Sequence, residues 1–226
     1  MKRSKPIRLP RRKPTRKVLF KIYQALRKQY GHRHWWPGDT PFEVMVGAIL
    51  TQNTAWINVE RAIQNLRQHG LLTPQSLLRI SQSRLAKEIR PAGYFNVKAV
   101  RLKNFVRFFF SEYGGSVKRM SRERGLRLRE KLLKVNGIGE ETADSILLYA
   151  SGKPFFVVDA YTRRVFMRHR YLKGIEKYQE IQALFERLLP RNVRLFNDYH
   201  AQIVQVGKDF CRKAPRCGEC PLQAYL

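Results

Sequence analysis

Two glycines around a single isoleucine, at 137–139, interrupt apolar residues that recur at helical spacing on both sides. The spacing predicts one helix that ends near Val135 and a second helix over Thr142 to Ala150. Because glycine lacks a side chain, the turn between them can be tight, and its backbone can approach a partner molecule closely. The chain is therefore expected to contain a helical hairpin whose second helix begins with outward-facing backbone amides.

The balance of charges indicates what such a hairpin would contact. Lysine and arginine number 45 against 17 aspartates and glutamates, so the formal net charge is +28. Nucleic acid is the usual partner of so basic a protein. Nine of the basic residues lie between Lys2 and Lys17 among three prolines and no acids, so residues 1–17 are predicted to form a disordered basic arm. The body, residues 18–226, keeps a charge of 28 − 9 = +19.

On so basic a protein, the outward amides of the hairpin are expected to bind a DNA phosphate. Backbone N–H groups and the helix dipole together favour an anion at the start of a helix, and this contact carries no sequence information. The candidate DNA-binding residues of the hairpin are Asn136, Gly137, Ile138, Gly139 and Thr142. An ordinary helix connection closed by a glycine explains the hairpin alone equally well.

Most of the remaining chain also carries helix signals. Thr40-Pro41 and Thr73-Pro74 each place a capping residue before a proline, and Gly114 follows a long helical pattern. The run at 155–158 resembles a strand, but one such run makes no sheet. The fold class is therefore all-α. The apolar stretches are too short to span a membrane. We expect a soluble monomer without a membrane partner, in the cytoplasm with a bacterial nucleoid or in a nucleus.

A lone aspartate, Asp159, follows the apolar run at 155–158 and can cap a helix that begins at Ala160. The hairpin, the apolar run and this aspartate together resemble the helix-hairpin-helix DNA glycosylases of the endonuclease III superfamily. The resemblance extends from about Trp35 to Cys220, which is nearly the whole body of the chain.

The resemblance implies a two-lobed, all-α fold with a DNA-binding cleft between the lobes. Lobe A, with the hairpin, is expected at about 39–150, and lobe B at about 18–38 plus 151–226. The implied catalytic group is Asp159, whose carboxylate would stabilise the positive charge that develops at C1′ as the base leaves. Capping and catalysis are compatible, because a capping carboxylate is held rigidly by its helix. The implied function is a base-excision-repair DNA glycosylase that flips a damaged base out of double-stranded DNA.

Glu141 indicates which chemistry of the superfamily to expect. Members that also cut the DNA strand carry a lysine at this position, and its amine attacks C1′ and forms a Schiff base. A carboxylate cannot form an imine, so the resemblance implies a monofunctional enzyme that hydrolyses the N-glycosidic bond and leaves an abasic site. Lys134 and Lys153 lie nearby in the sequence, so a bifunctional glycosylase and lyase of the endonuclease III type stays an alternative.

Aromatic residues are the candidates for holding the flipped base. Trp35, Trp36 and Trp56 are all the tryptophans of the chain, Tyr94 lies in the segment RPAGYFNVKA, and Glu141 is a further candidate for the pocket. These segments look most like 3-methyladenine DNA glycosylases, and a cationic N3-alkylated adenine gains from stacking on indoles. A position in the core is the simpler explanation for a tryptophan at helical spacing, such as Trp56.

Other assignments of function stay open at this point. Gln52 occupies a segment that the resemblance places at the mouth of the cleft, where a polar side chain can fill the gap left by the flipped base. A mismatch-specific thymine or uracil glycosylase shares the hairpin and the aspartate, and it is the first alternative. A non-catalytic DNA-binding protein would use the hairpin and the basic arm for phosphates alone, but it gives no reason for Asp159.

All three cysteines, Cys211, Cys217 and Cys220, lie within the last sixteen residues, as in a metal-binding cluster. Their spacing resembles the C-terminal iron–sulfur loop of the superfamily, in which four cysteines hold a [4Fe–4S] cluster. The fourth is expected six residues after Cys220, where this sequence has Leu226. Either another ligand completes the site, the sequence stops short of one, or the cluster is lost. A zinc site of the three cysteines with His200 has no support from spacing.

Overall fold

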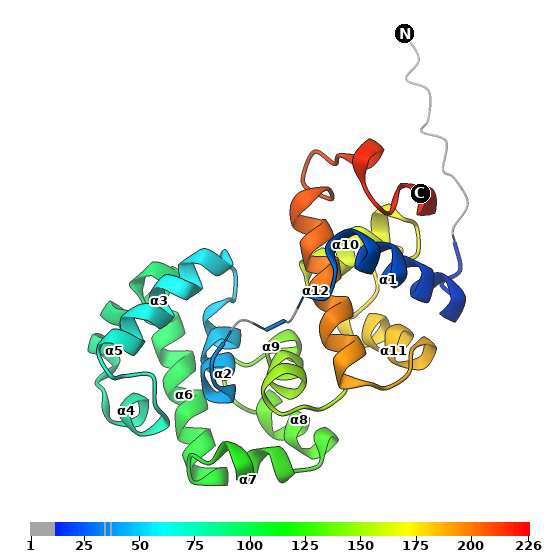
Figure 1. Cartoon of the computed structure of the whole chain (residues 1–226). Helices are drawn as coiled ribbons and strands as arrows, with labels where there is room; N and C mark the ends of the chain where they lie inside the picture. Colours follow the sequence, from blue (N-terminus) through cyan, green and yellow to red (C-terminus); the bar gives the residue numbers. More distant parts are fainter. Residues whose placement is uncertain (1–11, 34, 37) are drawn as a thin grey trace. The chain divides into compact units, whose positions relative to one another are not determined.

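The computed structural model describes residues 12–33, 35–36 and 38–226 and is all-α, as predicted (Figure 1). No strand occurs among these residues. Short 3₁₀ segments cover Arg90–Ala92, Cys217–Glu219 and Gln223–Tyr225, and a π-helical segment covers Ile146–Ala150. The α-helices are α1 (Arg16–Tyr30), α2 (Pro41–Leu50), α3 (Trp56–Gln68), α4 (Pro74–Arg79), α5 (Gln82–Glu88), α6 (Phe95–Tyr113), α7 (Val117–Arg122), α8 (Gly125–Leu133), α9 (Glu140–Ser145), α10 (Ala160–Arg168), α11 (Tyr178–Leu188) and α12 (Val193–Asp209).

The chain divides into two compact units, each built from separate stretches of sequence. Unit 1 contains 12–33, 158–190 and 198–226, and unit 2 contains 35–157 and 191–197. The segments around residues 35–36, 151–157 and 191–197 therefore pack with unit 2, whereas the sequence had assigned them to lobe B. No helix in the described ranges is long and apolar enough to cross a membrane.

The basic arm ends earlier than the sequence predicted. α1 begins at Arg16, and Thr15 caps it by accepting a hydrogen bond from the Val18 backbone N–H at 3.3 Å. The prediction that the arm extends to Lys17 is therefore wrong, because the capping threonine starts the helix before the run of charges ends. Residues 1–11 of the predicted arm lie outside the described residues.

Unit 2 is organised around α2, whose residues Phe42 to Leu50 are all buried. The helix begins as predicted: Thr40 Oγ1 accepts from the Glu43 backbone N–H at 3.1 Å, and Pro41 occupies the first turn. Because α2 is apolar on nearly every side, it can be surrounded, and α3, α6 and α9 pack against it. The buried acid Glu43 is neutralised by Arg67 at 2.8 Å.

Unit 1 has a separate aromatic core. Phe185 of α11 lies edge-on to Phe166 of α10, with ring centroids 4.9 Å apart, and it also contacts Tyr199 of α12. Tyr199 is fully buried, and its hydroxyl donates to the Leu19 carbonyl of α1 at 2.8 Å. Each unit thus has its own core and holds its functional side chains on packed helices.

Candidate active site and DNA interface

The hairpin predicted from the two glycines is present in unit 2. α8 ends at Leu133, Gly137 adopts a positive φ of 96°, and α9 begins at Glu140 directly after Gly139. Gly139 is exposed, and no side chain caps the amides that follow it. Ile138 between the two glycines is 5 % exposed and anchors the turn in the core.

A buried ion pair fastens the two helices of the hairpin to each other. Arg129 of α8 binds both carboxylate oxygens of Asp144 of α9, at 2.7 and 3.0 Å. Asp144 is fully buried, and Arg129 also lies 3.6 Å from Glu140 in the first turn of α9. A bidentate pair fixes orientation as well as distance, so the turn between the helices is held in one geometry.

Gln52, which follows α2, is part of the hairpin's support. Its side-chain amide donates to the Gly137 carbonyl at 3.0 Å and to Thr142 Oγ1 at 2.9 Å, and its oxygen accepts from Arg101 of α6. The hydrogen-bonding groups of Gln52 are thus engaged inside unit 2. Filling a gap in DNA would require these bonds to break, and that role of Gln52 stays a prediction.

The other hairpin residues named from the sequence differ in exposure. Asn136 and Gly139 are exposed, whereas Ile138 and Thr142 are buried. The Asn136 carbonyl accepts from the Asn104 side chain of α6 at 3.2 Å. The exposed part of the turn is therefore mostly backbone, which suits a phosphate contact that ignores base sequence.

The three tryptophans, although separated in sequence, form one cluster in unit 2. Trp36 lies edge-on to Trp56, with ring centroids 5.0 Å apart, and Trp35 lies 5.6 Å from Trp36 and 6.4 Å from Trp56. Tyr149 joins the cluster at 4.9 Å from Trp36, a contact that the sequence did not reveal. Gly47 of α2 lets the Trp56 ring pack closely against the helix, because a Cβ at position 47 would lie 3.3 Å from that ring.

Two features of these aromatic residues bear on a base pocket. The Trp36 indole nitrogen is buried, donates to no described residue and lies 3.5 Å from the place that a Cβ on Gly47 would occupy. Tyr94, in contrast, is 72 % exposed, with a positive φ of 46°, just before α6. Glu141 is exposed in the first turn of α9. The structure thus brings the indoles together and leaves Tyr94 and Glu141 at the surface of the described chain.

Asp159 in unit 1 caps α10, as the sequence predicted. Its Oδ1 accepts from the Thr162 backbone N–H at 2.7 Å, and its side chain is 12 % exposed. Burial alone would raise the pKa of Asp159, but the nearby His200 imidazole and the hydrogen bonding from Thr162 outweigh burial, so the pKa lies below its ordinary value. The carboxylate is therefore ionised at neutral pH, which is the form that stabilises a developing cation.

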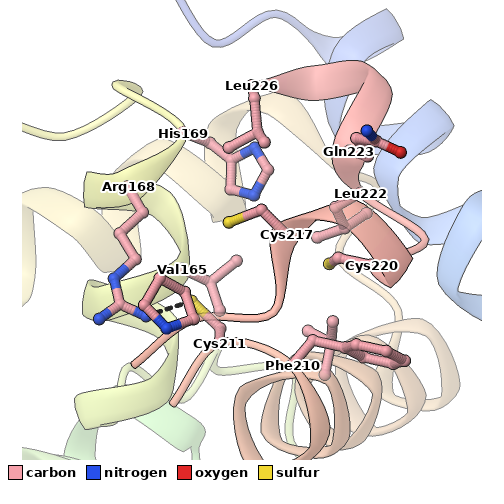
Figure 2. A pocket seen from close by; sticks show the side chains of 12 residues that line it. Val165, Arg168, His169, Phe210, Cys211, Cys217, Cys220, Leu222, Gln223 and Leu226 are labelled. Carbon is pink, nitrogen blue, oxygen red and sulfur yellow. Dashed lines mark hydrogen bonds between the residues drawn. The ribbon is translucent and has the colours of Figure 1, made fainter. Parts of the chain in front are cut away.

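The cysteine loop offers three thiolates, one fewer than a [4Fe–4S] cluster normally takes. Cys211, Cys217 and Cys220 line one cavity of about 20 Å³ together with His169 and Leu226 (Figure 2). Leu226, at the position expected for the fourth thiolate, contributes an apolar wall. Among the described residues, no group of three or more potential ligands is arranged to hold a metal ion. A [4Fe–4S] cluster normally takes four thiolates, so the residues present do not fit it.

Arginines bind the cysteine loop instead. Arg168 of α10 donates to Cys211 Sγ at 3.3 Å and to the carbonyls of Arg212 and Lys213, and Arg164 donates to the Cys211 carbonyl at 2.6 Å. His200, the zinc ligand considered from the sequence, lies against Asp159. The histidine near the cysteines is His169, whose Nδ1 donates to the Tyr225 carbonyl at 3.0 Å. Burial lowers the pKa of His169, so this side chain is neutral.

Comparison with known proteins identifies the family. The model of the HhH-GPD superfamily of base excision DNA repair proteins matches residues 46–191. The chain belongs to this superfamily. A Methanocaldococcus jannaschii protein named as a DNA repair glycosylase is 47% identical over 209 residues, which cover 92% of this chain and 95% of that protein. Endonuclease III of Thermotoga maritima is 29% identical over 186 residues, which cover 82% of each chain.

Solved structures agree with this assignment. The H. pylori 3-methyladenine DNA glycosylase bound to 1,N6-ethenoadenine has a TM-score of 0.72 and 31% identity, covering 84% of this chain and 97% of that one. A non-covalent complex of endonuclease III with DNA has a TM-score of 0.79 at 20% identity, covering 94% and 95% of the two chains, and shares the fold. The superfamily recognised from the sequence is confirmed, and the chain is a DNA repair glycosylase of this family.

Proposed function

We propose that this HhH-GPD glycosylase removes an alkylated purine, such as 3-methyladenine, by hydrolysis without cutting the strand. The observation that carries the proposal is the cluster of Trp35, Trp36 and Trp56 in unit 2. Electron-rich indole faces attract a cation, and an N3-alkylated adenine is positively charged in DNA. Such a base also leaves its sugar readily, so one carboxylate that stabilises the cationic sugar is sufficient for catalysis.

Each unit supplies one part of the proposed reaction. In unit 2, the indole cluster would hold the base, and the amides after Gly139, which no side chain caps, suit a phosphate. In unit 1, the ionised Asp159 would stabilise the cationic sugar and orient the attacking water. The cleft that the family resemblance implies for these groups stays a prediction.

The hydrolytic mechanism rests on Glu141. At the position where strand-cutting relatives are expected to carry a lysine, this chain has an exposed carboxylate, which cannot form a Schiff base. The similarity to the H. pylori 3-methyladenine DNA glycosylase supports the same choice of substrate. Mismatched thymine and uracil are the alternative substrates that the experiment must include.

The proposal is tested by single-turnover release of the base from duplexes carrying 3-methyladenine, 7-methylguanine, hypoxanthine, uracil or a T·G mismatch. We expect release of 3-methyladenine and no covalent protein–DNA product after borohydride treatment. Asp159→Asn should lower the rate by about 10³-fold or more, the loss typical when a transition-state charge is left unstabilised. DNA binding should be retained, because asparagine also caps helices well.

A matched control makes the same chemical change at the surface. Asp39 is 76% exposed and pairs with Arg67, so Asp39→Asn should keep the wild-type rate. Wild-type activity in Asp159→Asn would exclude the proposed mechanism. Release of uracil or thymine in place of 3-methyladenine would assign the enzyme to mismatch repair, and a borohydride-trapped complex would show a lyase.

We propose in addition that the cysteine loop is closed by arginine bonds and does not depend on a [4Fe–4S] cluster. Arg168 and Arg164 bind the loop through its carbonyls and through Cys211 Sγ, and the cavity holds about one water-sized particle. Anaerobically purified protein should contain far less than four irons per chain, and chelation should leave its melting temperature unchanged.

Replacement of Arg168 should then reduce the stability of the protein more than removal of metal does. Arg168→Ala removes three hydrogen bonds and should destabilise the protein by about 1–3 kcal/mol, whereas Lys213→Ala, at an exposed position in the same loop, should have little effect. Near-stoichiometric iron and sulfide, together with a melting temperature that falls on chelation, would contradict this proposal.

A further inference from the structure

The two carboxylate oxygens of Asp159 have different partners. Oδ1 accepts from the amide of Thr162 in the first turn of α10, and Oδ2 lies 3.6 Å from Nε2 of His200 on α12. The His200 side chain is 5% exposed, so this contact is largely withdrawn from solvent. Both residues belong to unit 1. The helix cap therefore fixes Oδ1, and the imidazole lies beside Oδ2.

Hydrogen bonds between α12 and the segment that contains α1 hold His200 in place. The residue two positions earlier, Asp198, is 1% exposed and accepts from Tyr23 at 2.7 Å and from the Arg33 backbone N–H at 2.9 Å. Tyr199 bonds the Leu19 carbonyl. Because consecutive residues before His200 are tied to α1, α12 cannot rotate or slide without breaking buried hydrogen bonds.

The packing of α10 against α12 fixes the other side of the pair. Gly207 of α12 lies so close to Tyr161 of α10 that a Cβ would come within 2.4 Å of its ring. Arg164 of α10 donates to the Gly207 carbonyl at 3.0 Å. These contacts set the register of α10 against α12, and with it the separation of Asp159 and His200.

We infer that His200 is a positioning residue, which orients the Asp159 carboxylate toward the reacting sugar. The inference rests on the proposed catalytic role of Asp159 and adds a residue to it. An imidazole beside Oδ2 limits rotation of the carboxylate about χ2, so the oxygen that faces the sugar is defined before DNA binds. Preorganisation of this kind lowers the barrier because no reorientation is needed during the reaction.

His200 is the titratable side chain that the described structure places against Asp159. No lysine or arginine in the described chain forms an ion pair with Asp159, and the groups that face it are His200 from α12 and the amide and side chain of Thr162 from α10. From α11, the Tyr178 hydroxyl accepts from the neighbouring Val158 N–H at 3.3 Å. His200 is therefore the side chain that lies beside Oδ2.

The experiment compares His200→Phe and His200→Gln with the wild type. In single-turnover assays, His200→Phe should lower the rate constant by about 10- to 100-fold, the loss expected when a catalytic group is slightly misplaced, with little change in the DNA concentration for half-maximal rate. His200→Gln keeps a donor beside Oδ2 and should recover part of the rate. The control His169→Phe removes another buried histidine of unit 1, away from Asp159, and should keep the wild-type rate.

A second measurement separates this inference from the proposed function. The carboxyl ¹³C signal of Asp159 in the free protein reports its pKa without any substrate. Loss of the imidazole leaves burial less opposed, so the pKa of Asp159 should rise in His200→Phe, and the acidic limb of the rate profile should move to higher pH with it.

The outcomes are distinct. A wild-type rate and acidic limb in His200→Phe, while Asp159→Asn is inactive, would overturn the inference and leave the proposed function intact. An active Asp159→Asn would overturn the proposed function and, with it, this role of His200. If His200→Phe does not fold, the decision passes to His200→Gln, which keeps a donor but loses the charge that an imidazole can carry. The carboxyl pKa of Asp159 should then rise, and an unchanged pKa would refute the coupling of the two residues.

Discussion

At the scale of single residues, Gly137 shows why the hairpin needs a glycine at one of its two positions. Its φ of 96° is unfavourable for other residues, and a Cβ would lie 2.2 Å from Cγ of Arg101. We expect Gly137→Ala to lower the free energy of unfolding by about 1–3 kcal/mol, measured by urea denaturation, and to weaken binding to undamaged duplex DNA.

Gly139 provides the matched control for this substitution. Its φ is −91°, and a Cβ there would meet nothing within 4 Å, so Gly139→Ala should be nearly neutral in stability. Adding Arg101→Ala to Gly137→Ala removes the Cγ that clashes and should restore part of the lost stability. Equal stability of the two single alanine variants would show that the positive φ and the contact with Arg101 do not constrain the turn.

The residues of the site differ in how far sequence could predict them. Asp159 was found because a lone acid after an apolar run has a local signature as a helix cap, and the structure confirms the cap. Arg101 was missed, and His200 was considered only as a zinc ligand, because each contacts the site from a helix distant in sequence. Spacing along one helix carries no information about which side chain of another helix will face it.

At the scale of secondary structure elements, the starts of α2 and α4 were predicted from their capping threonines. Thr40 and Thr73 both cap helices as expected, at 3.1 Å from the amide three residues on, because a cap is a local interaction. The long helix α6, in contrast, begins at Phe95 after Tyr94 without a side-chain cap. The turn at Gly93-Tyr94, with positive φ at both residues, decides that start.

Two buried lysines of α6 bind carbonyls at the ends of other helices, where the sequence has no capping signal. Lys103 donates to the carbonyls of Leu77, Leu78 and Ile80, and so satisfies the end of α4. Lys98 donates to the Leu50 carbonyl at the end of α2, and burial lowers its pKa to about 8. In the sequence both lysines look like solvated positions on an amphipathic helix. Their function as caps depends on tertiary contacts, which is why sequence alone did not reveal it.

At the scale of the whole molecule, charge is the property that the sequence determines most directly. A net charge of +28 predicts strong, salt-dependent binding to DNA, because lysines and arginines that contact phosphates release counterions. The structure shows how much of the arm can be deleted without loss of contacts to the folded body. Arg12 donates to the carbonyl oxygens of Tyr225 and Leu226, and Thr15 caps α1, so a cut beyond residue 11 would disturb unit 1.

Deletion of residues 1–11 is therefore the test of the arm's role. It removes five basic residues and lowers the net charge to 28 − 5 = +23 without touching α1. If all five contact phosphates, the slope of log affinity against log salt should fall by up to about 4.5 for duplex DNA. Replacing the five residues by glutamine should reproduce the deletion, whereas scrambling their order should keep the wild-type slope, because charge and not sequence drives counterion release. An identical slope with and without the arm would mean that the arm makes no phosphate contacts, and that residues 12–226 account for the whole electrostatic attraction to DNA.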